Sequence, residues 1–244
     1  MAENKIESLK IGPGEKKALT KFLGALKDCP ELRLLSYTLY GSAAGNNYHP
    51  EKSDMNILVA AENISIPVLK ELVPAISEAR MSGISPFFTT AADMLASADV
   101  FPVKFMSMRD RYVVLEGEDI LASLQIKKEN LRLRCEQEAR NIHMRLTRFY
   151  VTNSGRGLIR SVSKMAGGFF ETLRAALSIG SEKLLPVEDV FAAAEKRFGI
   201  AKLDLEKINA TKRMNVSPGP DESETVFMLL LDASKKLAGH IDGM

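Results

Sequence analysis

The chain has 244 residues, 45% of them hydrophobic, so it can bury one large core or two modest ones. Its formal net charge of +2 is too small to indicate a nucleic-acid partner by itself. No apolar run approaches the length of a membrane span, and the first residues lack an apolar signal core. The two cysteines, Cys29 and Cys135, have no metal-binding spacing. These features predict a cytoplasmic protein with reduced thiols.

Strand and helix patterns alternate through the first half of the chain. Apolar residues recur at helical spacing over Glu15–Asp28, and Pro67 suits the first turn of a helix that continues to Met81. A short helix is expected at Ala91–Ala98. The expected strands are Leu34–Tyr40, Met55–Ala61, Ile84–Thr90, Val100–Met108 and Tyr112–Leu115. This order predicts a small mixed sheet covered by helices.

From Ile126 onward no strand pattern returns. A long helix carries an apolar stripe from Leu131 to Phe149, and Asn153–Gly157 ends it. Further helices are expected at Leu158–Ile179, from Pro186 to Gly199, at Leu203–Met214 and at Asp221–Ile241. The predicted fold class is α+β, with an α/β domain over residues 1–124 followed by an all-α helical bundle over residues 125–244.

A polar connection between the first two expected strands carries the most specific pattern in the chain. It opens with Gly41-Ser42 and closes with Ser53-Asp54, directly before the strand Met55–Ala61. A glycine turn and a carboxylate then lie at one end of a sheet. Backbone N–H groups there can hold phosphates, and the acid can hold a divalent cation.

This pattern resembles the signature of the DNA polymerase β-like nucleotidyltransferases. In that family a Gly-Ser turn precedes an Asp-x-Asp pair at the start of the next strand, and a third acid lies on a later strand. The resemblance implies that Gly41, Ser42 and Ser53 contact a nucleoside triphosphate and that Asp54 is a Mg²⁺ ligand. It also implies transfer of a nucleoside monophosphate to an acceptor by metal-assisted phosphoryl chemistry.

The chain departs from the family pattern at the acids. Asn56 takes the second position, and a neutral amide binds Mg²⁺ much less strongly than a carboxylate does. The best candidate strand for the third acid, Val100–Met108, has Lys104 between apolar neighbours. We therefore expect Asp54, Asn56 and Lys104 to form a degenerate catalytic centre, in which Lys104 either replaces the metal charge or extends to water.

Two functions remain open on the sequence. The first is a catalytically impaired nucleotidyltransferase-like protein that binds a nucleotide, another phosphate ligand or a protein partner. The second is an active Mg²⁺-dependent enzyme that transfers a nucleoside monophosphate to a small molecule or protein, with Asp99, Asp110 or Glu116 completing the site.

The densest basic region lies in the helical half. It includes Arg140 and Arg145, which we take as candidate phosphate contacts, although a solvated helix face explains the same pattern. No aromatic residues interleave with these charges in the way that stacks on bases, which argues against a nucleic-acid partner. The apolar content of the last helices is compatible with a homodimer.

Overall fold

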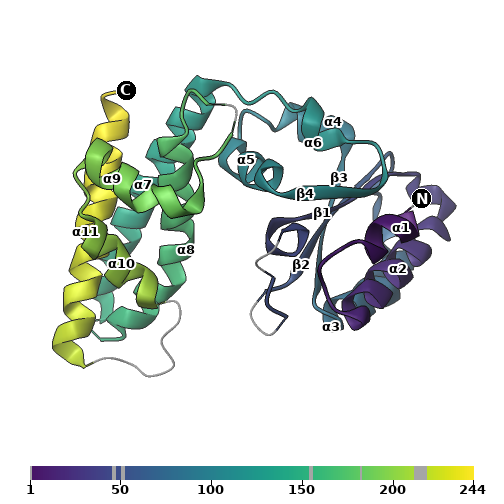
Figure 1. Ribbon diagram of the computed structural model, residues 1–244, viewed down its shortest axis with the longest axis horizontal. Helices are drawn as coiled ribbons and strands as arrows, with labels where there is room; N and C mark the ends of the chain where they lie inside the picture. The colour runs from purple at the N-terminus through teal and green to yellow at the C-terminus, as the bar shows by residue number, and fades with distance from the viewer. Residues whose placement is uncertain (1, 46–47, 51–52, 154–155, 182, 212–218) are drawn as a thin grey trace. The chain divides into compact units, whose positions relative to one another are not determined.

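The computed structural model describes residues 2–45, 48–50, 53–153, 156–181, 183–211 and 219–244. Contacts divide the chain into two compact units (Figure 1). The first, the sheet unit, comprises residues 1–98 and 107–125, and the second, the helical unit, comprises residues 99–106 and 126–244. The sequence places the boundary after residue 124 and assigns 99–106 to the first part instead.

The sheet unit contains four strands in the order β3-β2-β1-β4 within its described residues. Strand β1 runs antiparallel to both β2 and β4, and β2 runs parallel to β3. The strands are β1 (Leu34–Tyr40), β2 (Met55–Ala61), β3 (Ile84–Thr90) and β4 (Tyr112–Gly117). The expected mixed sheet is therefore present, and with the helical part that follows it the α+β class is confirmed.

Helices α1–α3 lie on one face of this sheet (Figure 1). Residues Tyr37, Ile57 and Val59 on that face share a buried cluster with Phe22 and Leu26 of α2. The phenol of Tyr37 donates a hydrogen bond of 3.1 Å to the backbone oxygen of Leu19, which satisfies its one polar group. The helices of this unit are α1 (Ala2–Glu7), α2 (Pro13–Lys27), α3 (Ile66–Met81), α4 (Ala91–Ala96) and α6 (Ile120–Ser123), with 3-10 turns η1 (Pro30–Leu32) and η2 (Gly41–Ala44).

One expected strand is wrong. Val100–Met108 lies mainly in a helix, α5 (Pro102–Asp110). Pro102 stands at its first turn, where the missing N–H costs nothing. Val103 and Met106 are buried in the helical unit's core, while Phe105 and Met108 are also buried, so this helix is covered on more than one face. A short apolar run that is buried all round has no clear helical period, which is why it resembles a strand.

The helical unit is a bundle built on a second hydrophobic core. Its helices are α7 (Lys128–Asn153), α8 (Leu158–Leu177), α9 (Val190–Phe198), α10 (Lys202–Ala210) and α11 (Pro220–Asp242), with the 3-10 turn η3 (Val187–Asp189). Leu146, Phe169 and Phe227 are fully buried where α7, α8 and α11 pack. The expected end of one helix at Met214 lies outside the described residues. Within the described chain, no helix has both the length and the apolar character needed to cross a bilayer.

Candidate functional site

The polar connection lies at one edge of the sheet, where β1 ends and the other three strands begin. Tyr40 pairs with Asn56 on one side and with Tyr112 on the other. Asn56 in turn pairs with Ser85 on β3. Side chains that pair in register lie on the same face of a sheet, so these four residues form one polar row. The row lies on the face opposite the one that α2 and α3 cover.

Gly41 makes the turn at this edge possible. Its φ of +80° is in the left-handed region, which a glycine adopts without strain. Its N–H donates a hydrogen bond of 2.9 Å to the backbone oxygen of Arg111, just before β4. A Cβ at Gly41 would lie 3.4 Å from the side-chain nitrogen of Asn56. The turn is thus held directly beside the polar row.

The described part of the chain offers no partner to three side chains that the motif predicts at this edge. None of Ser42, Asp54 and Asn56 makes a side-chain hydrogen bond to another described residue. Asp54 is exposed, and Asn56 is half-buried. Ser53 instead closes the connection through its backbone N–H, which donates to the oxygen of His49 at 3.0 Å. Three oxygen-bearing side chains are therefore available to a ligand.

A tyrosine lies near the acid. Burial first, and then the negative charges of Glu15 and Asp54, raise the pKa of Tyr48 above its usual range. Its phenol therefore stays protonated near neutral pH and can act as a hydrogen-bond donor. No motif in the sequence singles out Tyr48.

Arg111 is a second residue near this turn that no sequence motif indicates. A Cβ at Gly45, the residue after η2, would lie 3.1 Å from Cδ and 3.7 Å from Nη1 of Arg111. The arginine side chain therefore lies against the end of the Gly41–Ala44 turn, and the absence of a side chain at Gly45 makes room for it. Its Nε is 3.6 Å from the carboxylate of Asp110. Arg111 brings a permanent positive charge to the edge where Ser42 lies.

The acids at this edge do not fit a two-metal centre. The strand beside β2 is β3, and its residue in register with Asn56 is Ser85, a neutral hydroxyl. The local set is then one carboxylate, one amide and one hydroxyl, together with a nearby arginine. Mg²⁺ prefers carboxylate and phosphate oxygens, and a guanidinium repels it. Within the described residues there is also no group of three or more His, Cys, Asp or Glu side chains arranged for a metal.

The acids proposed to complete the site lie in three different places. Glu116, on β4, pairs with Tyr37, which faces the helices, and its carboxylate accepts a 2.9 Å bond from Lys27 of α2. It is therefore on the wrong face for Asn56. Asp99 belongs to the helical unit. Asp110 belongs to the sheet unit and its carboxylate lies beside Arg111, the residue that contacts the end of the turn, so it is the candidate that the structure places near the turn.

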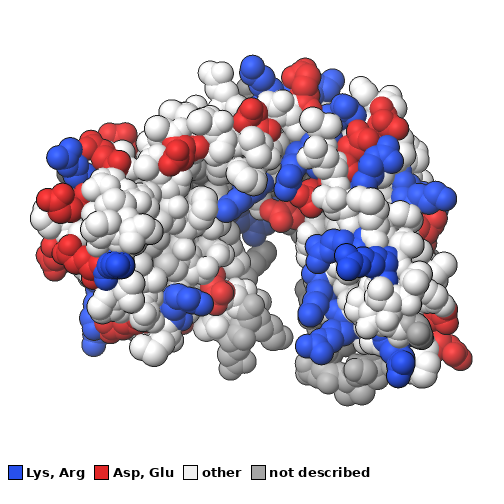
Figure 2. Space-filling view, turned by 180° about the vertical axis from the view of Figure 1, so that it is seen from behind, with Lys and Arg blue, Asp and Glu red and all other residues white. Residues whose placement is uncertain are grey.

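The three basic candidates belong to the helical unit. Lys104 lies on α5 and not on a strand beside Asn56, so the prediction that it occupies the third acid position is wrong. Its pKa is lowered, mainly by burial, while Glu171 acts in the opposite direction. On α7, Arg140 pairs with Glu136 at 2.8 Å and with Asp242 at 3.1 Å, whereas Arg145 is exposed. Figure 2 shows Lys and Arg side chains gathered on part of this unit's surface.

Comparison with known proteins shows the fold alone. No protein-family model matches the chain, and no curated protein sequence matches it. It is similar in structure to spectinomycin adenyltransferase AAD(9) from Enterococcus faecialis, solved with ATP and spectinomycin. The TM-score is 0.57 over 91% of this chain and 98% of that chain, at 13% sequence identity. The resemblance to nucleotidyltransferases inferred from Gly41-Ser42 and Asp54 is thus confirmed at the level of the fold.

Proposed function

We propose that this chain binds the phosphate groups of a nucleoside triphosphate at the Gly41–Ala44 turn without needing a divalent cation, and does not transfer the nucleotide. The observation that carries the proposal is the position of Arg111 against this turn, while Asn56 and Ser85 stand on the strands beside it. A cation-binding site needs several carboxylates, whereas Asp54 is the one acid of the motif here and the nearby Asp110 carboxylate is paired with Arg111 at 3.6 Å. The charge that Mg²⁺ would supply to the phosphates comes here from the guanidinium.

The chemistry of the turn supports phosphate as the ligand. An arginine donates several N–H groups in a planar fork that matches phosphate oxygens. The hydroxyl of Ser42 and the amide of Asn56 add neutral donors on the same edge. The structurally similar AAD(9) was solved with ATP, which supports a nucleotide as the source of these phosphates.

Calorimetric titration with ATP, GTP, CTP and UTP, each with and without Mg²⁺, tests the proposal. We expect binding of at least one nucleotide that does not weaken when EDTA replaces Mg²⁺. Arg111→Gln should weaken that binding about 10-fold or more, because a charge-assisted hydrogen bond contributes about 1.5–3 kcal/mol. Binding that requires Mg²⁺, or no binding to any nucleotide, would contradict the proposal.

The matched control is Arg80→Gln. Arg80 is an exposed arginine near the end of α3 in the same unit, and it forms no ion pair with another described residue. The two variants remove the same charge from the sheet unit. Equal losses of affinity would mean that only the net charge matters, and would argue against a contact made by Arg111.

The alternative is an active Mg²⁺-dependent transferase, and one observation favours it. Asp54, directly before β2, is exposed and its side chain bonds no other described residue, while Asp110 precedes Arg111, whose backbone oxygen accepts the Gly41 N–H. In that case the chain should transfer labelled nucleoside monophosphate to a small molecule or protein, and Asp54→Ala should abolish the transfer. Activity that persists in Asp54→Ala would exclude Asp54 as the essential ligand.

A further inference from the structure

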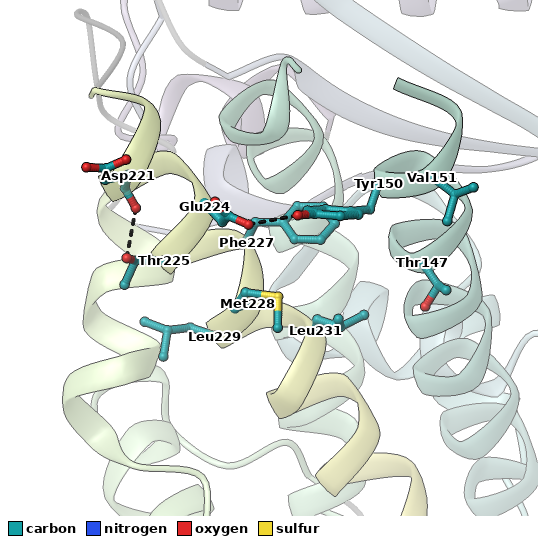
Figure 3. A pocket seen from close by; sticks show the side chains of 10 residues that line it. All are labelled: Thr147, Tyr150, Val151, Asp221, Glu224, Thr225, Phe227, Met228, Leu229 and Leu231. Carbon is teal, nitrogen blue, oxygen red and sulfur yellow. Dashed lines mark hydrogen bonds between the residues drawn. The ribbon is translucent and has the colours of Figure 1, made fainter. Parts of the chain in front are cut away.

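The helical unit has an apolar groove on the side where α7 and α11 run next to each other. The two helices are antiparallel: Tyr150 donates a 2.8 Å hydrogen bond to Glu224, and a ring nitrogen of His143 lies 3.2 Å from the oxygen of Leu231. Between them is a cavity of about 830 Å³ (Figure 3). It is lined from α7 by Thr147, Tyr150 and Val151, and from α11 by Asp221, Glu224, Thr225, Phe227, Met228, Leu229 and Leu231.

The groove extends along α7. A second cavity of about 490 Å³ shares Thr147 and Val151 with the first and reaches Met144. The exposed fractions are 73% for Val151, 59% for Met144 and 49% for Met228. Three large apolar side chains open to water on two adjacent helices form a contiguous patch, which is typical of a surface that another protein covers.

The two sides of this groove carry opposite charges. Arg148 lines the α7 side, and Asp221 and Glu224 line the α11 side. Neither Arg148 nor Asp221 forms an ion pair with another residue of the described chain. Figure 3 shows Asp221 and Glu224 on the opposite side of the cavity from Val151. The surface is therefore basic on one side, apolar in the middle and acidic on the other side.

We propose that the groove between α7 and α11 binds the same groove of a second copy of this chain, forming a two-fold symmetric dimer. The two-fold axis runs along the apolar middle of the groove. It places the basic side of each copy against the acidic side of the other. Val151 on α7 of each copy then packs against the α11 side that carries Met228 of the other copy, and each Arg148 faces the acidic side that carries Asp221. A partner of one charge would complement only one side and meet repulsion on the other.

Variants with one reversed charge on the groove test whether the two copies pair symmetrically. In Arg148→Glu each dimer contact becomes acid against acid, and in Asp221→Arg it becomes base against base. Both contacts of a symmetric dimer are affected, so each variant alone should have the mass of one chain by light scattering coupled to gel filtration. An equimolar mixture of the two variants restores opposite charges at both contacts. We expect that mixture, like the wild type, to have the mass of two chains.

Two further variants separate the interface from folding. Val151→Ser removes an exposed apolar side chain from the groove and should weaken dimerisation at least 10-fold, while the far-UV circular dichroism stays unchanged. Lys207→Glu reverses an exposed charge on α10, away from the groove lining, and should leave the dimer intact. A wild-type chain that stays monomeric at every concentration would overturn the proposal, and so would variants that fail to associate when mixed.

Discussion

At the scale of single residues, the edge beside Gly41 differs from a metal centre at a few side chains. Asp54 supplies a carboxylate, but Asn56 and its neighbour Ser85 supply neutral oxygens. Arg111 adds a positive charge against the turn. An edge with one carboxylate and a nearby arginine binds Mg²⁺ less strongly than an edge with several carboxylates. It binds a phosphate without a metal more strongly. The proposed phosphate site therefore depends on a positive charge at this edge in place of additional carboxylates.

This difference from a metal centre should be reversible by substitution. Asn56→Asp combined with Ser85→Glu would place three acids, with Asp54, on adjacent strands at one edge. We expect this double variant to bind Mn²⁺, measured by electron paramagnetic resonance of the free ion, with an affinity at least 10-fold above that of the wild type. Glutamate suits position 85 because Ser85 is exposed and has room for a longer side chain.

The control for this experiment is Asn56→Gln with Ser85→Gln, which changes size without adding charge. It should bind no more Mn²⁺ than the wild type does. Equal Mn²⁺ affinity in the acidic and the amide double variants would show that these two positions do not face a common cation site. The edge would then not become a metal site when carboxylates are placed at positions 56 and 85.

The sequence predicted part of this site for a physical reason. Gly41, Ser42 and Asp54 lie within one connection between two strands, so their meeting follows from local chain geometry. Arg111 and Ser85 reach the same edge only through strand pairing. Their partners are set by the register of β4 and β3, and no short pattern in the chain encodes that register. Lys104 was predicted at the site because Val100–Met108 was expected to be a strand, whereas this lysine lies on α5.

At the scale of elements, strands rich in apolar and β-branched residues were the easiest to predict. β1, β2 and β3 begin and end where the sequence places them, because apolar and β-branched residues stop at glycine or polar residues. The failure at α5 occurred where burial on several faces removed the helical period. The small helix α1, with only Ala2 and Ile6 buried, has too few apolar positions to show a period at all.

The end of β4 shows how one glycine can determine an element. Gly117 has a φ of +78°, and a Cβ there would lie 1.9 Å from the backbone oxygen of Leu35. That oxygen also accepts a 2.9 Å hydrogen bond from Glu118, so it cannot move without breaking the pairing of β4 with β1. The position requires both a left-handed backbone and an absent side chain.

Gly117→Ala should therefore lower the free energy of unfolding much more than backbone strain alone does. We expect a loss of about 3 kcal/mol or more in urea unfolding, since strain and a backbone clash add. Gly83→Ala is the matched control, because Gly83 has a similar φ of +76° but no atom within 4 Å of the new Cβ. It should cost only about 1–2 kcal/mol. Similar losses in the two variants would contradict a role for the close approach.

At the scale of the whole molecule, the chain has two hydrophobic cores with no residue in common. One contains Tyr37, Leu39 and Ile57 of the sheet unit, and the other contains Phe169, Leu173 and Phe227 of the helical unit. A unit with its own core can unfold in its own transition. The chain should then show two calorimetric transitions, each sensitive to substitutions in one core.

Core substitutions and a ligand can assign these transitions. Leu39→Ala should lower the midpoint of one transition and Leu173→Ala that of the other, since each removes a fully buried leucine at a cost of about 2–5 kcal/mol. If the nucleotide binds at the Gly41–Ala44 turn, saturating ATP should raise the transition that Leu39→Ala lowers, because a ligand stabilises the unit that holds it.

The effect of ATP on the transition that Leu173→Ala lowers tests whether the sheet unit alone holds the nucleotide. A site made only by the sheet unit predicts no ATP effect on the transition that Leu173→Ala lowers. If ATP raised both transitions equally, its effect would not be confined to the sheet unit, and that result would contradict a site made by the Gly41–Ala44 turn alone. A single transition that both substitutions lower would instead contradict the independent unfolding of the two cores.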